Sequence, residues 1–185
     1  MKNLIYITNS KIANSNSDGK GIFADSNFKF KDLVYQPKGK IVNAESIDWD
    51  AIGKEGYDGF LQIGGWDYFD GRKDAYFKFL NHSCNPNLGF KNLDGKVSFV
   101  AIKPISKNKE LTFDYSTTMF EELDEEPMPC ICKSKNCRKI IRDFRFLPKK
   151  TQEKYIKLGI VPDYVLDECS QEKPMLKNKA FQNSK

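Results

Sequence analysis

Long hydrophobic runs are missing from this chain. No stretch of its 185 residues approaches the ~18 consecutive apolar residues that a membrane helix needs. The opening sequence MKNLIYITNS offers only the run Leu4–Ile7, which is too short for the core of a signal peptide. The sequence therefore predicts an intracellular protein, in the cytoplasm or the nucleus, with no membrane partner. A secretion system that reads another signal, for delivery into a host cell, would escape this test.

A strong charge of one sign is also lacking, as are internal repeats. Thirty Lys and Arg residues face 25 Asp and Glu residues, so the net charge is only +5. We take this charge to be spread along the chain. Such a spread is a weak argument for a nucleic-acid partner, because phosphate-binding proteins usually concentrate basic residues on one face. We therefore predict no direct binding of nucleic acid.

The residues that are present suit one globular domain. Hydrophobic residues make up 39% of the chain and include 14 phenylalanines, while 30% of the residues are charged and keep the surface solvated. A chain of this length buries roughly 70% of its unfolded surface. A sizeable core is therefore expected.

Short apolar segments separated by turn residues dominate the first two-thirds of the chain. Asp94-Gly95 is a strong hairpin signal. The pattern is mostly β with small helical inserts (α+β), and it lacks the alternating β-α units of a doubly wound nucleotide-binding fold. The expected strands are Leu4–Thr8, Gly21–Asp25, Leu33–Gln36, Lys40–Val42, Phe60–Ile63, Tyr68–Asp70, Lys96–Ile102 and Glu110–Ser116.

Helices are few in this interpretation. Ser46 is placed to cap a helix over IDWDAIGKEG, and Ala75–Leu80 is a short helical segment. Near the end, TQEKYIKLG has helical spacing, with Thr151 as its cap and Gly159 as its stop.

Three of the five cysteines lie close together, in the sequence CICKSKNC. They are Cys130, Cys132 and Cys137. Inside a cell, clustered thiols more often hold metal than form disulfides, and Zn²⁺ takes about four ligands in a tetrahedron. The fourth ligand has to come from Cys84, Cys169 or His82. We favour Cys84, since Cys169 follows an apolar segment and has the character of a spare thiol; three unrelated loop cysteines are the alternative.

Four sequence motifs in order resemble one family. SDGKGIFA resembles its amino-terminal Gly-x-Gly motif, FLNHSCNPN its Asn-His-Ser-Cys motif, ELTFDY the motif that ends in its catalytic tyrosine, and CICKSKNCR its carboxy-terminal cysteine spacing. The family is the SET-domain protein-lysine methyltransferases with a post-SET zinc-binding extension, and the resemblance covers roughly Ile7 to Ile141. It implies small curved β-sheets with a pseudoknot that brings the Asn-His and Tyr motifs together.

The resemblance also implies the chemistry, which is methyl transfer from S-adenosylmethionine to a lysine of a protein. Tyr115 matches the catalytic tyrosine, and Phe113 matches a position where Phe rather than Tyr permits di- or trimethylation. The cysteine of the Asn-His-Ser-Cys motif, Cys84, joins the post-SET cysteines on zinc in the family. Positions that match cofactor contacts are Asp18, Gly19, Lys20, Gly21, Asn81, His82 and Ile140. On their own, the glycines would indicate a hairpin turn and Ile140 an ordinary core residue.

The domain organisation that follows has five parts. A SET domain over 1–119 is followed by an acidic linker, 120–129, which holds five carboxylates and two prolines. The remainder comprises a post-SET zinc segment, 130–146, a helical extension, 147–170, and a tail, 171–185, for which disorder is expected.

Some positions depart from the family pattern. Asp74-Ala75 replaces Gly-Asn, Lys78 replaces Arg, and Lys133 and Lys139 replace post-SET glycines. A degenerate module that binds peptide or cofactor without turnover is therefore one alternative, and a zinc-stabilised interaction domain without cofactor is another. The carboxylates of the linker suit a basic, histone-like tail as substrate, although a solvated linker explains them as well.

Overall fold

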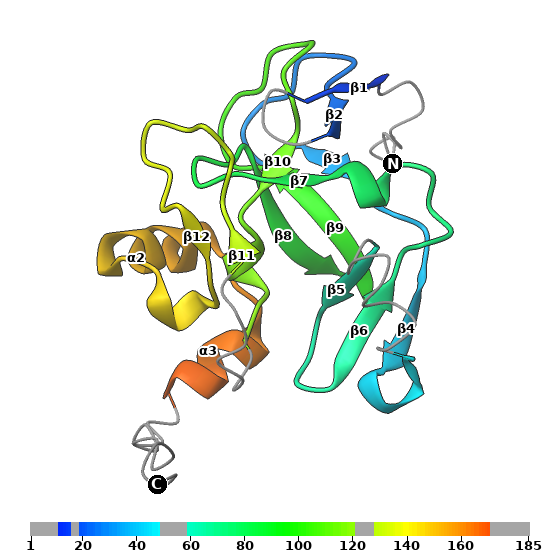
Figure 1. Cartoon of the computed structure of the whole chain (residues 1–185), viewed down its shortest axis with the longest axis vertical. Coiled ribbons are helices and arrows are strands. Elements are labelled where there is room, and N and C mark those ends of the chain that lie inside the picture. The colour runs from blue at the N-terminus through cyan, green and yellow to red at the C-terminus, as the bar shows by residue number, and fades with distance from the viewer. Residues whose placement is uncertain (1–10, 16–18, 49–58, 121–127, 171–185) are drawn as a thin grey trace, which may run out of the picture.

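The computed structural model describes residues 11–15, 19–48, 59–120 and 128–170, which form five small sheets and two helices (Figure 1). Hairpin β1–β2 is antiparallel, β7 and β10 pair in parallel, and β11–β12 is a short antiparallel ladder. The other two sheets have the orders β3-β9-β8 and β4-β6-β5. The strands are β1 Lys11–Asn14, β2 Lys20–Phe23, β3 Leu33–Tyr35, β4 Lys40–Asn43, β5 Phe60–Gln62, β6 Asp67–Asp70, β7 Asn81–His82, β8 Leu88–Leu93, β9 Lys96–Ala101, β10 Thr112–Phe113, β11 Met128–Pro129 and β12 Ile140–Ile141.

The main core gathers aromatic residues around strand β9. Phe99 is fully buried, and its ring lies 5.0 Å from that of Phe113 and 6.2 Å from that of Phe77. Strand β9 forms a hairpin with β8, and both turn residues, Asp94 and Gly95, have positive φ. This conformation suits the right-handed twist of the strands, and the sequence Asp-Gly predicts it.

The parallel pair β7–β10 positions the site. Asn81 lies opposite Thr112, and His82 lies opposite Phe113, although some thirty residues separate the two strands in the chain. The Asn87 side chain reinforces the pair, since its amide donates to the Glu110 carbonyl and its oxygen accepts from the Thr112 N–H. Figure 1 shows both strands between the β1–β2 hairpin and the β8–β9 hairpin. The contact between the two motifs, which the resemblance predicts, is therefore present.

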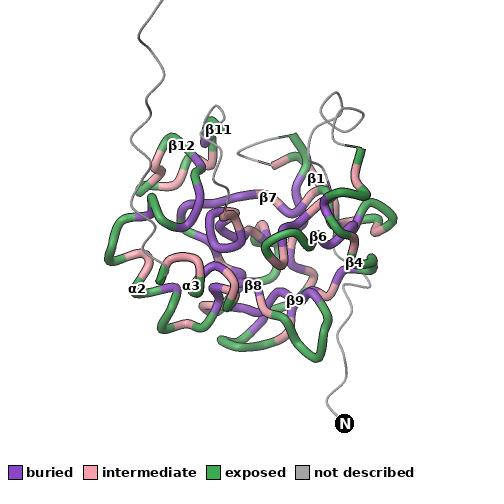
Figure 2. Tube along the Cα trace, turned by 90° about the horizontal axis from the view of Figure 1, so that it is seen from below, coloured by how far each residue is buried: buried purple, intermediate pink, exposed green. Residues whose placement is uncertain are grey.

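A second core lies under the two carboxy-terminal helices. Helix α2 spans Lys149–Leu158 and α3 spans Asp163–Ser170. Figure 2 shows buried residues through the middle of the molecule, with exposed segments at its periphery, including part of α2. The buried members of this core are Phe144, Leu147, Tyr155, Ile160, Val161 and Val165. None of the described helices is long and apolar enough to cross a bilayer.

Most expected elements are found, with corrections at their ends. Helix α2 stops at Gly159, as predicted, but it begins after Pro148, so Thr151 is not its cap; proline fits the first turn because it lacks an N–H. Ser46 does not cap a helix, since it ends the short 3-10 turn Ala44–Ser46, which Asn43 caps, and Ile47 is extended; residues 49–56 of the helix expected there lie outside the described residues. Of the segment expected as a strand at Glu110–Ser116, only Thr112–Phe113 forms a strand, and Tyr115–Thr117 is a 3-10 turn.

Further differences from expectation concern the linker and two strands. Met128–Pro129, the end of the expected linker, forms strand β11, strands β1 and β8 were not expected, and α3 lies within the expected helical extension. Leu4–Thr8, Asp18 and the tail 171–185 lie outside the described residues.

Candidate active site and metal centre

Tyr115 and His82 are in direct contact, although they belong to different motifs. The backbone N–H of Tyr115 donates to Nδ1 of His82 at 3.2 Å, and the two ring centroids are 5.3 Å apart at 69°. The Tyr115 hydroxyl donates to the carbonyl oxygen of Leu80 at 2.8 Å. Both ends of the tyrosine are thus fixed by the segment that contains Asn81 and His82.

The glycine motif meets the same segment through Asn81. The Asn81 side-chain amide donates to the Lys20 carbonyl at 3.0 Å and to Oε1 of Glu110 at 2.9 Å. A Cβ on Gly21 would lie 2.3 Å from that carboxylate oxygen, so a larger residue there would displace the Glu110 side chain, whereas the positive φ of Gly19 suits a turn. Glu110 was missed as a site residue, although it is the first letter of the ELTFDY motif.

The imidazole of His82 is neutral and has a defined tautomer. Burial lowers the pKa of His82 to about 4; it outweighs the raising effect of the Asp114 carboxylate, and the positive charge of Arg138 adds a smaller lowering. Because Nδ1 accepts a hydrogen bond, the proton of the neutral ring resides on Nε2. This Nε2–H lies 3.4 Å from the sulfur of Cys84 and is placed to donate to it.

The four cysteines of the predicted zinc site lie together. The sulfur of Cys130 is 3.6 Å from those of Cys84 and Cys137, and the sulfur of Cys132 accepts from the Cys84 N–H at 3.5 Å. A tetrahedral Zn²⁺ with ~2.3 Å bonds to sulfur separates its ligands by about 3.8 Å. These residues therefore fit a zinc ion. Cys169 packs in the core under the carboxy-terminal helices instead.

A second set of four ligands has His82 in place of Cys137. Ligand atoms of His82, Cys84, Cys130 and Cys132 all lie within 4.8 Å of one another. Coordination through Nε2 would require that nitrogen to lose its proton, but Nδ1 is already used as an acceptor. The hydrogen bonds of His82 thus favour four sulfurs, whereas the mutual distances of the ligand atoms include His82 and not Cys137.

Backbone N–H groups donate hydrogen bonds to two sulfurs of this cluster. Arg138 N–H donates to Cys84 at 3.3 Å, and Lys139 N–H donates to Cys137 at 3.4 Å. Burial raises the pKa of the Cys84 thiol to about 11. Burial also acts on Cys132, but hydrogen bonds from Cys84 and Ser134 outweigh it and lower that thiol's pKa to about 6. A metal ion would thus displace protons from some of these sulfurs.

The lysines that replace family glycines keep the glycine backbone. Lys133 has φ 53° and Lys139 has φ 68°, both in the left-handed region. A side chain strains the chain there, by ~1–2 kcal/mol per residue. The loop geometry is therefore retained in spite of the substitutions.

Asp74, another departure, organises the turn before the Asn-His motif. Its carboxylate accepts hydrogen bonds from the backbone N–H groups of Lys38, Tyr76 and Phe77 at 2.8–3.1 Å and from the Tyr35 hydroxyl. The turn is thereby tied to strand β3. The substitution is accommodated locally, so it gives no structural reason to expect an inactive module.

A buried ion pair joins the tyrosine motif to the metal loop. Arg138 donates from both terminal nitrogens to the Asp114 carboxylate, each at 2.7 Å, and Asp114 is almost completely buried. Tyr155 of α2 adds a third donor to the same carboxylate. The remaining donor of the guanidinium, Nε, is buried without a described partner.

Phe113 and Ile140 occupy contrasting positions. The Phe113 side chain is buried, with its ring centroid 4.8 Å from that of Tyr115. Ile140 is 41% exposed in β12, whereas its neighbour Ile141 is buried against Cys84 and Cys130. Phe113 is therefore part of the site, whereas Ile140 lies at its rim.

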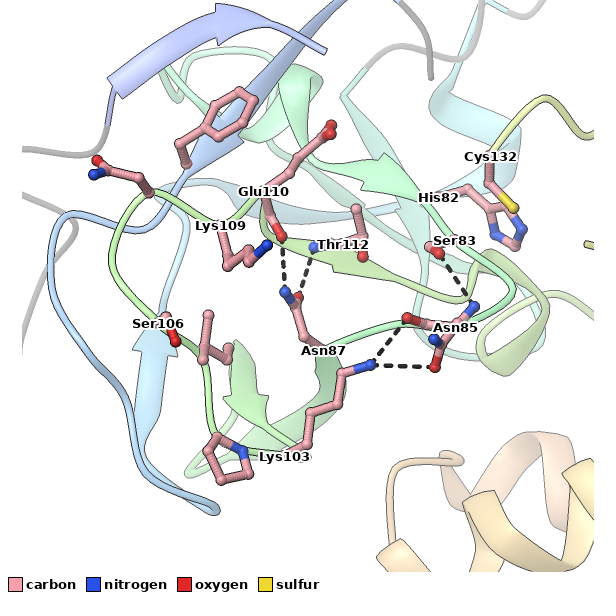
Figure 3. A pocket seen from close by; sticks show the side chains of 14 residues that line it. His82, Ser83, Asn85, Asn87, Lys103, Ser106, Lys109, Glu110, Thr112 and Cys132 are labelled. Carbon is pink, nitrogen blue, oxygen red and sulfur yellow. Dashed lines mark hydrogen bonds between the residues drawn. The ribbon is translucent and has the colours of Figure 1, made fainter. Parts of the chain in front are cut away.

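A polar cavity of about 590 Å³ opens beside this site (Figure 3). His82 and Cys132 line one end, and Lys103 lies at another, where its ammonium contacts both oxygens of Asn85 at 3.2 Å. Tyr115 is not among the residues that line this cavity. The cavity adjoins the site but is not the pocket around the tyrosine.

Comparisons with known proteins agree with these motifs. A sequence model of the family described as SET domain matches residues 19–116. The histone-lysine N-methyltransferase, H3 lysine-36 specific, of Candida glabrata is 28% identical in an alignment 181 residues long, gaps included, that covers 90% of this chain and 24% of that protein. The H3 lysine-4 specific enzyme of Saccharomyces cerevisiae is 34% identical in an alignment 71 residues long that covers 36% of this chain and 6% of that protein.

A solved structure supports the fold. The crystal structure of KRYPTONITE in complex with mCHG DNA and SAH is similar with a TM-score of 0.57 and 21% identity, and the match covers 74% of this chain and 30% of that one. The chain spans about a quarter or less of the length of the curated relatives named above. With the family match over residues 19–116 and this fold, the chain belongs to the SET-domain family.

Proposed function

We propose that the chain is a protein-lysine N-methyltransferase that uses S-adenosylmethionine and acts on a histone-like tail inside the cell, in the cytoplasm or nucleus. The observation that carries the proposal is the contact of Tyr115 with His82, which joins the tyrosine motif to the Asn-His motif. Its similarity to histone-lysine methyltransferases supports the same activity. A solved relative with 22% identity holds an H3(1-15) peptide and SAH.

The residues around Tyr115 suit a lysine substrate. A free lysine has a pKa near ~10.4, and the neutral amine needed for attack is favoured where the surroundings are apolar. The aromatic rings of Phe113 and Tyr115 provide such surroundings, and they also tolerate a cation against their faces. Since the Tyr115 hydroxyl donates to Leu80, its oxygen can accept a hydrogen bond from the amine and align it.

We assign cofactor binding to the glycine turn and to the strand that holds Asn81 and His82. S-adenosylmethionine would supply an activated methyl group on a sulfonium. Gly19, Lys20 and Gly21 bring their backbone against Asn81, where a ligand can approach closely. We assign Asn81 and His82 to the same ligand, together with Asp18, which lies outside the described residues, and Ile140 at the rim.

Product specificity is assigned to Phe113. A tyrosine at this position would place a hydroxyl beside Tyr115 and crowd the amine, whereas Phe113 leaves that space apolar. Di- and trimethylation are therefore expected.

The test is a methyl-transfer assay with labelled S-adenosylmethionine on recombinant histones and on nucleosomes, with mass spectrometry of the product. We expect methyl-lysine from the wild type and at least about 100-fold less from Tyr115→Phe, a loss of the size that removal of a positioned catalytic group produces. Binding of S-adenosylhomocysteine, measured by calorimetry, should remain in the variant. Binding without turnover by the wild type would indicate a degenerate module, and absence of binding a zinc-stabilised interaction domain.

A further inference from the structure

The basic residues of this chain are concentrated in one segment. Residues 133–157 hold ten Lys and Arg against two Asp and Glu, a net charge of +8, whereas the whole chain carries +5. The premise that the charge is spread along the chain is therefore wrong. Since the rest of the chain is net negative, the segment is a localised positive region of the kind that phosphate-binding proteins present.

Helix α2 arranges part of this charge in a row. Lys150, Lys154 and Lys157 follow one another at spacings of four and three residues, so they lie on one face of the helix, and all three are exposed. Tyr155 points into the core from another face. The pairs Lys150–Lys154 and Lys154–Lys157 place like charges at spacings that destabilise a helix, although Lys157 in the last turn is favourable to it.

The row continues onto the SET domain. Ile102, the residue before Lys103, packs against the core under α2 and α3, and the positive charge of Lys154 adds to the effect of burial in lowering the pKa of Lys103. Lys103 in turn lines the cavity of about 590 Å³ together with Lys109 (Figure 3). The cavity is polar, and the zinc loop contributes Cys132 to its wall. The basic face thus extends from α2 to this cavity.

The lysines of the zinc loop contribute less positive charge to this basic face. Lys133, Lys135 and Lys139 are exposed, but four zinc-bound thiolates would carry net negative charge beside them. Arg138 and Arg145 are paired with Asp114 and Asp143. The charge available to a partner therefore resides in the row on α2, in Lys103 and in the exposed Arg142 and Lys149.

We infer that this face, defined by Lys103, Lys150, Lys154 and Lys157, binds the phosphate backbone of duplex nucleic acid. Along α2 the three lysines span about 10 Å, within reach of several successive phosphates of a duplex. Lysine contacts of this type carry affinity but no sequence preference. Stacking of single-stranded bases is disfavoured, since Phe146, an exposed ring in this segment, is covered by the guanidinium of Arg142 at 3.7 Å.

The inference goes beyond the proposed methyl transfer and is tested without it. Fluorescence anisotropy of a labelled 30-base-pair DNA duplex of mixed sequence is measured against protein concentration, at several salt concentrations. The variant is Lys150→Gln/Lys154→Gln/Lys157→Gln. Its matched control is Lys38→Gln/Lys40→Gln/Lys96→Gln, which removes the same charge from exposed lysines around another cavity, between β4 and β9.

We expect the wild type to bind with a steep salt dependence. The α2 variant should bind about 10-fold or more weakly at low salt, and its slope of log K against log salt should fall by about 2.7, for three lost phosphate contacts. The control should stay within about 2-fold of the wild type, because its lysines lie outside the basic face. Equal losses in both variants would overturn the inference, since net charge alone would then explain binding. Tighter binding to poly-L-glutamate than to DNA would overturn it in favour of an acidic protein.

Methyl-transfer activity provides a second, independent measurement. Turnover of a free histone-tail peptide should be the same in the α2 variant and the wild type, since none of the three lysines touches the Tyr115 site. Turnover on nucleosomes should fall with DNA affinity. If the chain transfers no methyl groups at all, the DNA measurement still decides this inference.

Discussion

The hydroxyl of Tyr155 donates a hydrogen bond to the carboxylate of Asp114 at 3.0 Å, across 41 residues of sequence. Asp114 directly precedes Tyr115 and also holds Arg138, whose backbone N–H contacts the sulfur of Cys84. One buried carboxylate therefore links helix α2, the tyrosine motif and the metal loop.

Removal of the Tyr155 hydroxyl should weaken both the fold and the metal loop. For Tyr155→Phe we expect the free energy of unfolding to fall by about 1–3 kcal/mol, because a buried charged acceptor loses a donor. Zinc should also transfer faster to a chelator, as followed with a colorimetric dye. Tyr164→Phe is the matched control, since that hydroxyl lies in the same helical region but contacts the carbonyl oxygens of Gln62 and Thr118. Identical zinc release from the two variants would argue against the link.

Glycine should give a more stable fold than lysine at the two left-handed positions of the metal loop. Lys133→Gly and Lys139→Gly are each expected to raise the free energy of unfolding by about 0.5–1 kcal/mol, because the steric strain exceeds the entropy cost of glycine. Denaturant titration of the zinc-loaded protein measures this change. Lys133→Ala and Lys139→Ala remove the same charges without relieving the strain, so they should not stabilise. Stabilisation by alanine would mean that charge, not backbone conformation, is responsible.

The zinc ligands can be separated from the spare thiol. Cys137→Ser should reduce the bound zinc, measured by mass spectrometry of the metal, well below one per chain, whereas Cys169→Ser should leave it at one. The reason is the position of the Cys137 sulfur, 3.6 Å from that of Cys130, while Cys169 lies in another core. Full zinc occupancy in Cys137→Ser would instead favour the set in which His82 is the fourth ligand.

The motifs of the site were predictable from the sequence because their chemistry is local. Three cysteines in eight residues indicate a metal loop without any knowledge of the fold, and Cys84 could be inferred by counting ligands. The pairing of β7 with β10 follows from family resemblance alone, since two-residue strands leave no periodic pattern.

Contacts between distant residues were not predictable. Nothing in the sequence indicates that Asp114 accepts from Tyr155, or that Asp74 accepts from Tyr35, because neither pair belongs to a motif or a common element. The basic face was missed for a different reason: the net charge of the whole chain hides the opposite charges of its parts.

A hydroxyl beside the catalytic tyrosine should change the product. Phe113→Tyr is expected to shift the methylated lysine from di- and trimethyl forms towards monomethyl. The Phe113 ring is buried with its centroid 4.8 Å from that of Tyr115, so the new hydroxyl enters the space beside the catalytic tyrosine. Mass spectrometry of the product at long reaction times measures the distribution. The thermal midpoint is recorded in parallel, so that a loss of fold is not mistaken for a change of product. Monomethyl-lysine as the sole product of the wild type would contradict the role of Phe113.

We propose that the segment around His82 and the phenol of Tyr115 together enclose the cofactor beside a four-sulfur metal centre. The decisive experiment is diffraction from crystals grown with zinc and S-adenosylhomocysteine. We expect ligand density against Asn81 and His82, with the sulfur of the ligand directed towards the Tyr115 hydroxyl, and a metal peak among Cys84, Cys130, Cys132 and Cys137. Ligand density remote from Tyr115, or a metal bound elsewhere, would contradict it.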